Sequence, residues 1–322
     1  MPWEQVLTWS FLIALLTAGI RLAVPVLLAV LGEIITERSG VMNLGLEGVM
    51  LVGGLAGFWA AASLEQATGS ASLAAWSGLG AGFLGGALMG LLMAVLTVSL
   101  RADQVVTGVT LVLFGQGLTA YFFRSQPGLS GARVTGLENW KIPGLSTLPI
   151  VGEVLFDQTA IVYLTALCVY VCWFFLFRTK AGLSLRAVGE NPAAADTSGV
   201  KVDRIRYLAV IIGSALAGLG GAVLTVVQLR LFTIGITAGR GWIAIAIVFF
   251  ARWRPGLALW GALLFGVADA LQYRIQALGS KQLPYEFLLM LPYVLTLIAL
   301  LRRSQNDAPA ALGIPYIKEN RS

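Results

Sequence analysis

Histidine is absent from this 322-residue sequence, and charged residues make up only 12% of it. Without histidine the chain lacks the side chain that most often serves as a general base and as a metal ligand. A soluble domain is about 25% charged, whereas this chain is 57% hydrophobic and has a mean hydropathy of +0.82. The composition therefore indicates an integral membrane protein.

Short enzyme motifs are missing as well. The sequence contains no GxxxxGK[ST] phosphate loop, no HExxH, no CxxC and no GxSxG. The two cysteines, Cys168 and Cys172, are four residues apart in an apolar run, a spacing typical of helix packing. The paired carboxylates Glu33 and Glu37 lie beside Arg38 at a membrane edge, which is a poor setting for acid–base chemistry. We therefore predict no catalytic residue, no metal site and no cofactor in this chain.

Apolar segments of about 20 residues, the length of a membrane helix, recur along the whole chain. They predict an all-α, polytopic transmembrane bundle of about nine spans in a single domain, residues 1–322. The seventh segment is short, and a re-entrant or broken helix is the alternative to a full span. The nine segments are roughly 6–31, 44–64, 74–99, 104–124, 158–177, 207–229, 240–252, 256–276 and 285–301.

The distribution of basic residues predicts the orientation, because lysine and arginine are enriched in cytoplasmic loops. If the polar loop 178–206 is cytoplasmic and the spans alternate, fourteen of the 22 lysines and arginines are cytoplasmic and seven are outside. The N-terminus is then outside and the C-terminus cytoplasmic. Residues 125–157 form an outer loop and residues 302–322 a cytoplasmic tail. Since the basic residues are distributed among loops between spans, the net charge of +6 does not indicate nucleic-acid binding.

The loop 178–206 contains the signals of a short helix over about residues 192–198. Asn191 is a good N-cap, and Pro192 suits the first helical position. Three alanines follow, and Gly199 can end the helix in the left-handed conformation. A two-turn helix is marginal alone in water, so it should dock on something. The alternative is a solvated loop with a frayed turn.

Several polar residues fall within or beside spans, where they are costly and often functional. Arg21 is either a structural anchor or part of a pathway. Asn43 and Glu47 share a helix face and either cap and pair locally or line an inner gate. Asp269 is either functional or paired with Arg274 or Arg240.

The third apolar segment carries a stripe of glycines spaced four residues apart. Such a GxxxG pattern lets another helix backbone approach closely. We therefore expect tight packing along this stripe, which consists of Gly78, Gly82, Gly86 and Gly90.

Four stretches resemble a known family: GEIITERSGVMNLGLEGVML, RADQVVTGV, LRAVGENPAAADTSGVKVDRIRY and the tail GIPYIK. They are similar to the permease subunits of bacterial ABC importers for nucleosides, within the wider branched-chain amino acid and simple-sugar permease family. The resemblance covers essentially the whole chain. It implies a multi-pass protein of the bacterial cytoplasmic membrane. It also implies three partners: a second homologous permease, an ATP-binding subunit with two nucleotide-binding halves, and an extracytoplasmic substrate-binding lipoprotein.

In such permeases the loop that corresponds to residues 189–199 is the coupling helix, through which ATP-Mg binding on the partner drives alternating access. The coupling residues that the resemblance implies are Arg186, Gly189, Glu190, Asn191, Pro192, Ala194, Asp196 and Gly199. The pathway should lie against the second permease, and amide linings suit a neutral, hydroxyl-rich substrate. The predicted pathway residues are Asn43, Glu47, Gln104, Gln116, Gln228 and Gln272. The alternatives are an ion-coupled carrier, a permease for a simple sugar or vitamin, and a membrane-embedded enzyme.

Overall fold

The computed structural model describes residues 8–126, 128, 131–277, 290, 294 and 307–317. Within these residues, seven helices are long and apolar enough to cross a membrane. The long helices are α2 (Trp9–Arg38), α3 (Leu46–Thr68), α4 (Ala71–Ala94) continued by η1 (Val95–Ser99), α5 (Gln104–Ser125), α7 (Ala160–Arg178), α10 (Val202–Ala222) continued by η2 (Val223–Gln228), and α12 (Pro255–Ala277). The shorter elements are β1 (Asn139–Lys141), α6 (Val151–Leu155), β2 (Asp157–Thr159), α8 (Lys180–Glu190), α9 (Pro192–Thr197) and α11 (Arg240–Phe250).

The first eight predicted apolar segments all appear as helices, which confirms the all-α fold. The seventh is α11, whose 11 residues reach only about 16 Å, well short of a bilayer core of about 30 Å. The ninth, residues 285–301, lies outside the described residues apart from positions 290 and 294. The number of spans and the sidedness of the termini therefore stay predictions.

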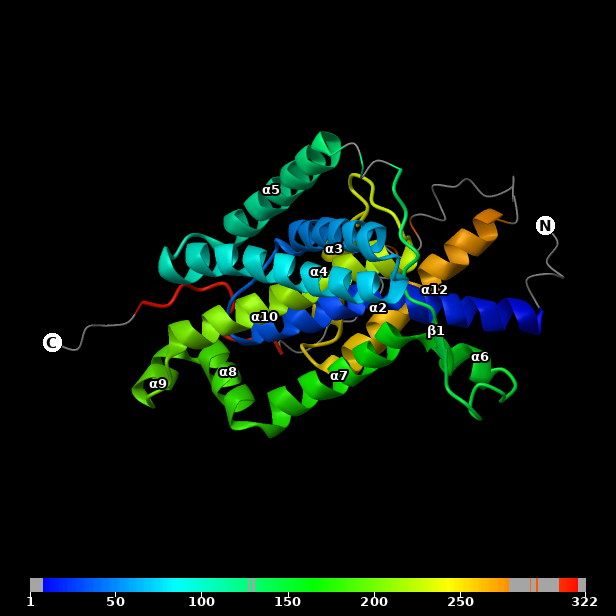
Figure 1. Ribbon diagram of the computed structural model, residues 1–322. Helices are drawn as coiled ribbons and strands as arrows, with labels where there is room; N and C mark the ends of the chain where they lie inside the picture. The colour runs from blue at the N-terminus through cyan, green and yellow to red at the C-terminus, as the bar shows by residue number, and fades with distance from the viewer. Residues whose placement is uncertain are drawn as a thin grey trace.

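The rod formed by α10 and η2 runs through the middle of the bundle, with α2, α3 and α4 packed around it (Figure 1). Glycines make this packing close. A Cβ on Gly218 would lie 2.7 Å from the backbone nitrogen of Gly86, and a Cβ on Gly57 would lie 2.9 Å from the carbonyl oxygen of Gly78. The predicted glycine stripe on α4 is thus in backbone contact with α3 and α10.

Because of this close contact, the effect of a glycine substitution on stability should depend strongly on its position along α4. A Cβ on Gly86 would meet the Ser214 carbonyl oxygen and lie 2.8 Å from the Cα of Gly218, whereas one on Gly80 would meet nothing within 4 Å. We expect Gly86→Leu to destabilise the bundle by about 3 kcal/mol or more, since overpacking against backbone cannot relax easily. Thermal unfolding of the purified complex measures this, with Gly80→Leu as the matched control. Equal melting temperatures for the two variants would contradict the close contact.

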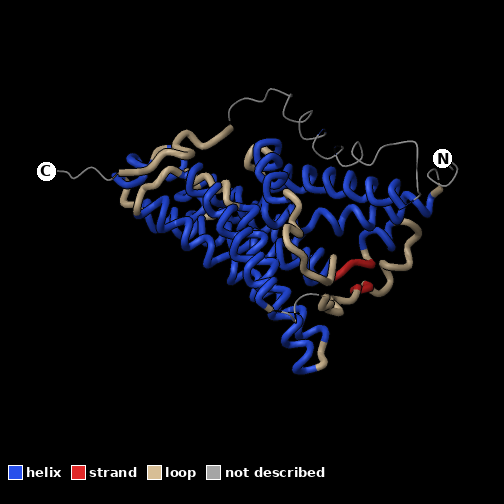
Figure 2. Tube along the Cα trace, turned by 90° about the horizontal axis from the view of Figure 1, so that it is seen from above, coloured by secondary structure: helices blue, strands red, loops and turns tan. Residues whose placement is uncertain are grey.

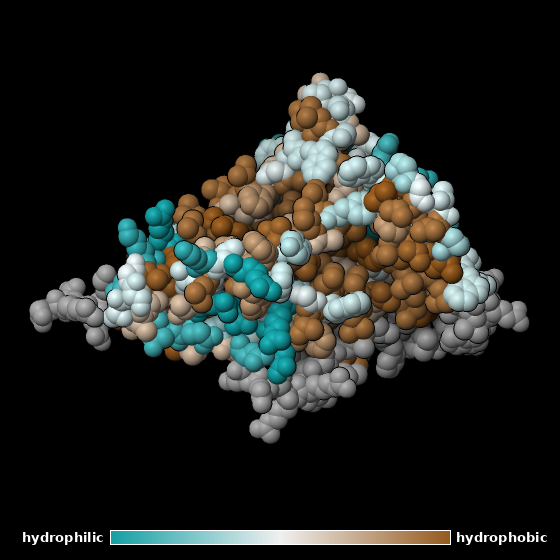
Figure 3. Space-filling model, turned by 90° about the horizontal axis from the view of Figure 1, so that it is seen from below, coloured by the Kyte–Doolittle hydropathy of each residue, from teal (hydrophilic) through white to brown (hydrophobic). Residues whose placement is uncertain are grey.

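The two ends of the bundle differ in character. One end carries α8 and α9, which we call the α9 end; the other carries the short antiparallel pair β1–β2 (Figures 1 and 2). Apolar side chains cover much of the face shown in Figure 3, and polar ones gather towards the α9 end. This distribution is that of a bundle surrounded by lipid with a polar end in water.

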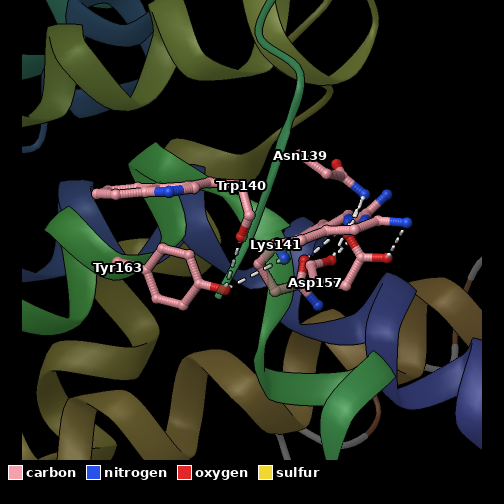
Figure 4. A network of polar contacts seen from close by, with 7 residues as sticks. Asn139, Trp140, Lys141, Asp157 and Tyr163 are labelled. Carbon is pink, nitrogen blue, oxygen red and sulfur yellow. Dashed lines mark hydrogen bonds and ion pairs between the residues drawn. The ribbon is translucent and has the colours of Figure 1, made fainter. Parts of the chain in front are cut away.

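Arg21 anchors the β1–β2 pair on α2. Its Nε donates to Oε1 of Gln158 at 2.8 Å, and its Nη2 donates to the Asp157 carbonyl at 3.1 Å. Asp157 in turn accepts from the Asn139 side chain at 3.1 Å and pairs with Lys141 at 3.9 Å (Figure 4). Of the two roles considered for Arg21, these contacts support the structural anchor.

Candidate functional site

The predicted short helix is present as α9, Pro192–Thr197, and its start follows the expected chemistry. Oδ1 of Asn191 accepts from the backbone nitrogen of Ala194 at 3.0 Å, and Pro192 occupies the first turn. Gly199 follows with φ of +85°, a left-handed conformation that favours glycine. The helix docks through Ala195, which is buried in a small cluster with Val188 and Val202.

A second helix that we did not predict, α8, leads into α9. Thr179 caps α8 by accepting from the Gly182 nitrogen at 3.0 Å. Gly189 near its end lies against the end of α2, where an added Cβ would meet the carbonyl oxygen of Arg38. Arg186, one of the coupling residues that the resemblance implies, is half-buried with its guanidinium 5.1 Å from the centre of the Phe177 ring.

Several of the predicted coupling residues are exposed around the start of α9. Asn191 and Ala194 are exposed, and Asp196 is half-exposed. Glu190 is exposed too, pairs with Arg38 at 4.0 Å, and accepts from the Ala310 nitrogen at 3.2 Å. The surface therefore presents a capped helix start on a rigid base, with polar and small side chains available to a partner.

The other predicted residues lie near the middle of the bundle, where two chain segments are not helical. Residues 39–45 run from the end of α2 to Ser214 on α10. The Ser214 hydroxyl accepts from the Asn43 side chain at 3.2 Å. Ser214 is near the centre of the 27-residue α10–η2 rod, about 20 Å from either end at about 1.5 Å per residue. Residues 229–239 begin beside β1, where Arg230 and Asn139 line one cavity, and they reach Glu47 through Thr237 and Gly239. Helices α3 and α11 therefore both begin at mid-depth.

Irregular backbone at this depth needs internal hydrogen-bond partners, because lipid supplies none. Three polar side chains provide them. Gln104 accepts from the Met42 nitrogen at 2.7 Å, Glu33 accepts from the Asn43 nitrogen at 2.9 Å, and Oδ1 of Asn43 accepts from the Gly45 nitrogen at 3.0 Å. Glu33, Asn43 and Gln104 are buried. Asn43 and Gln104 thus hold the unwound segment, and a pathway role for them stays a prediction.

Glu47 lies in the first turn of α3 and caps α11. Its two carboxylate oxygens accept from the Thr237 hydroxyl at 2.5 Å, the Gly239 nitrogen at 2.9 Å and the Gly241 nitrogen at 2.7 Å. The positive ends of two helix dipoles meet here, and a carboxylate between them is favourable. Glu47 is 5% exposed and fully engaged, so its contacts are those of a structural joint between α3 and α11.

Asp269 on α12 completes this joint. It pairs with Arg240, the first residue of α11, at 3.3 Å, and both side chains are largely buried. Of the partners considered for Asp269 from the sequence, the structure selects Arg240. The pair offsets the unfavourable placement of a cation at a helix N-terminus.

The three remaining pathway candidates lie in different surroundings. Gln272 is buried on α12. Gln116 is exposed in the middle of α5, where most of the other exposed side chains are apolar. Gln228, at the end of η2, lines a cavity of about 490 Å³ together with Arg21, Asn139 and Arg230. The predicted pathway residues therefore occupy several separate positions in the part of the bundle that the structure describes.

The Gln228 cavity presents both donors and acceptors. The Gln228 side-chain nitrogen donates to the Arg21 carbonyl, while its Oε1 is buried with no hydrogen-bond partner among the described residues. Arg21, Asn139 and Arg230 line the same space together with apolar residues that include Val223 and Val227. A cavity with apolar walls and a few polar groups is typical of small-molecule sites.

Some residues of these sites carried no sequence signal that we recognised. Ser214 and Thr237 each bond a candidate from about 170 to 190 residues away. Trp253, between Arg252 and Arg254, is buried and donates to Glu37. The described residues contain no group of three or more cysteine, aspartate or glutamate side chains placed to hold a metal ion.

A comparison with known protein families identifies the family of this chain. The model of the branched-chain amino acid transport system permease component matches residues 15–300. The chain belongs to this permease family. It is therefore a multi-pass membrane protein of the cell membrane and the translocation component of an ABC transporter, which works with an ATP-binding partner.

Curated relatives extend over most of the chain. The putative glucose ABC transporter permease protein TsgC13 of Haloferax volcanii is 48% identical, over 84% of this chain and 80% of its own length. The guanosine permease protein NupQ of Bacillus subtilis is 38% identical, over 93% and 95% of the two chains. The nucleoside permease protein NupC of Lactococcus lactis is 37% identical, over 91% and 93%.

A solved structure shares the fold of this permease. It is an inward-facing conformation of a putative metal-chelate type ABC transporter, with a TM-score of 0.51 and 16% sequence identity. The match covers 93% of this chain and 88% of that one. At this identity the likeness concerns the fold alone.

Proposed function

We propose that this permease forms half of the translocation pathway of an ATP-driven nucleoside importer and that α9 is its contact with the ATPase. The observation that carries the coupling role is the capped two-turn helix held at the polar end of the bundle. Asn191 and Pro192 start it, and Ala195 docks it. A capped and docked helix of this kind can be displaced by a partner without unfolding. The α9 end is then cytoplasmic, and the β1–β2 end faces the extracytoplasmic binding protein.

An ion-coupled carrier is a poorer match to these contacts. Such carriers usually keep ionisable groups along the pathway. The two acids that the sequence offered for that role are Glu47 and Asp269. Glu47 accepts from three donors, and Asp269 is paired with Arg240. Both acids are committed to the joint between α3, α11 and α12.

The proposed partners follow from the same function. A second, related permease would complete the pathway, and an ATP-binding subunit with two nucleotide-binding halves would carry ATP-Mg. A substrate-binding lipoprotein would deliver the solute. The nucleoside assignment draws on the names of NupQ and NupC, each similar over more than nine-tenths of the chain. A simple sugar is the second candidate, because TsgC13 is named as a putative glucose permease and shares 48% identity.

Solute uptake distinguishes these substrates. The complete complex in proteoliposomes should take up labelled nucleosides when ATP is enclosed with the ATPase, and an excess of glucose should not compete. Competition by glucose with no uptake of nucleosides would favour the sugar. Ligand binding to the partner binding protein should show the same preference.

The pathway residues make a separate prediction. If Gln116 and Gln228 contact a neutral solute, replacing either with leucine removes one hydrogen bond and should raise the KM of uptake about two- to tenfold. Gln66→Leu, at an exposed position near the end of α3, is the matched control. An unchanged KM in both pathway variants would exclude these side chains from solute contact.

A further inference from the structure

The C-terminal segment, Asp307–Ile317, lies on the α9 end of the permease rather than projecting away from it. Two of its backbone nitrogens bond the last turn of α8. The Ala311 nitrogen donates to the Gly189 carbonyl at 2.9 Å, and the Ala310 nitrogen donates to Glu190 at 3.2 Å. Tyr316 packs against the small cluster beneath α9. The segment therefore contacts both the end of α8 and the cluster on which α9 docks.

The same segment also holds two other elements. The Gly313 nitrogen donates to the carbonyl of Gly40, just after α2, at 3.2 Å. The Ile314 carbonyl accepts from Arg206 at 3.2 Å, and Arg206 is a nearly fully buried arginine in the first turns of α10. These bonds tie the segment to both α2 and α10.

A third attachment reaches α11. Asp307 pairs with Arg252 at 3.0 Å, and Arg252 lies two residues beyond the end of α11. The next residue, Trp253, is buried and bonded to Glu37 on α2. From this point α11 runs as one rigid helix to the joint at Glu47. The chain of contacts thus leads from α9 to the middle of the bundle.

We propose that residues 307–317 tether the coupling helix α9 to the half-helix α11, so that displacement of α9 by the ATPase moves α11 and its joint at Glu47. Asp307 is then a positioning residue for transport, acting through Arg252. The proposal rests on the coupling role of α9 proposed above. It adds a route by which motion reaches mid-depth without passing through the packed glycine interface of α4 and α10.

Charge exchange at the Asp307–Arg252 pair tests the tether. In proteoliposomes that contain the complete complex, Asp307→Arg should lower the amount of solute carried per ATP hydrolysed about threefold or more. The double variant Asp307→Arg/Arg252→Asp should recover most of that ratio. Simple destabilisation would lower hydrolysis and uptake together. Co-purification of the ATPase with each variant confirms that the complex still assembles.

The Asn191→Gly/Pro192→Gly variant is measured in parallel to separate the two proposals. If it uncouples while Asp307→Arg and deletion of residues 307–322 leave the ratio unchanged, the tether is wrong and the coupling role of α9 stands. If neither α9 nor the C-terminal segment affects the ratio, both proposals fall. A lowered ratio in Asp307→Arg that the exchanged pair does not restore would also contradict a tether through Arg252.

Discussion

Glu47→Gln is expected to abolish transport and to destabilise the bundle by on the order of 3 kcal/mol. The carboxylate accepts from the Thr237 hydroxyl and from two backbone nitrogens at the start of α11. An amide can accept at only one oxygen, and it would turn its own N–H groups towards other donors. The charge that balances two helix N-termini would be lost as well. Thermal unfolding and uptake by the complete complex measure the two effects.

Glu65 provides a matched control on the same helix. It also accepts from a backbone nitrogen and a hydroxyl, those of Thr135, but these hydrogen bonds are exposed to water. Because water can replace those bonds, Glu65→Gln should change the melting temperature and uptake little. If both glutamine variants behaved like the unmodified protein, Glu47 would not hold the joint between α3 and α11.

Asn191→Gly/Pro192→Gly is expected to uncouple ATP hydrolysis from uptake. The double substitution removes the side-chain cap on the Ala194 nitrogen and the fixed backbone angle at the first helical position. A six-residue helix has few hydrogen bonds of its own, so without its cap α9 should fray when the ATPase displaces it. We expect uptake to fall tenfold or more, on the order of 1.4 kcal/mol in coupling, while the spans remain folded. Solute carried per ATP hydrolysed is the quantity to measure.

Loss of a cap elsewhere is the appropriate comparison. Asp103 caps α5 by accepting from the Val106 nitrogen at 2.8 Å, and α5 is 22 residues long. Asp103→Gly should lower stability only slightly, by about 0.3 kcal/mol, and leave the coupling ratio unchanged. An equal loss of coupling in both variants would mean that α9 has no special role.

Local chemistry explains what the sequence could predict. The start of α9 follows from neighbouring residues: a capping side chain at Asn191, a proline after it, and a glycine at position 199. The spans follow from hydropathy, and the glycine stripe on α4 follows from spacing. Each of these signals lies within a short stretch of sequence, so it can be recognised without knowledge of the rest of the chain. The family resemblance rests on such local stretches too.

Depth within the bundle could not be predicted in the same way. Glu33 and Glu37 were interpreted as a charged cluster at the inner surface, and the first span was ended at residue 31. In the structure α2 continues to Arg38, and both glutamates are fully buried. Their partners are the backbone of Asn43 and the indole of Trp253, and the latter is more than 200 residues away. Only tertiary packing makes that burial possible.

The helices that begin at mid-depth could not be predicted for the same reason: their position depends on tertiary packing. Hydropathy alone does not distinguish a full span from a half-helix joined to a segment of bends and turns, as at residues 229–239. The signal that was available was the shortness of the segment 240–252, which allowed a re-entrant helix. Meeting helix N-termini near the bilayer midplane are a known way to build a movable centre in transport proteins. Here Glu47 occupies that point.

ATP-dependent uptake by a matched set of proteoliposomes measures most directly whether the permease is moved from α9. The set contains this permease alone, the complete complex, and the complete complex with Asn191→Gly/Pro192→Gly. Nucleoside uptake should occur only in the unmodified complex with ATP available to the ATPase, while the α9 variant continues to hydrolyse ATP. Uptake by the permease alone, or undiminished uptake by the α9 variant, would contradict the proposal that α9 drives transport.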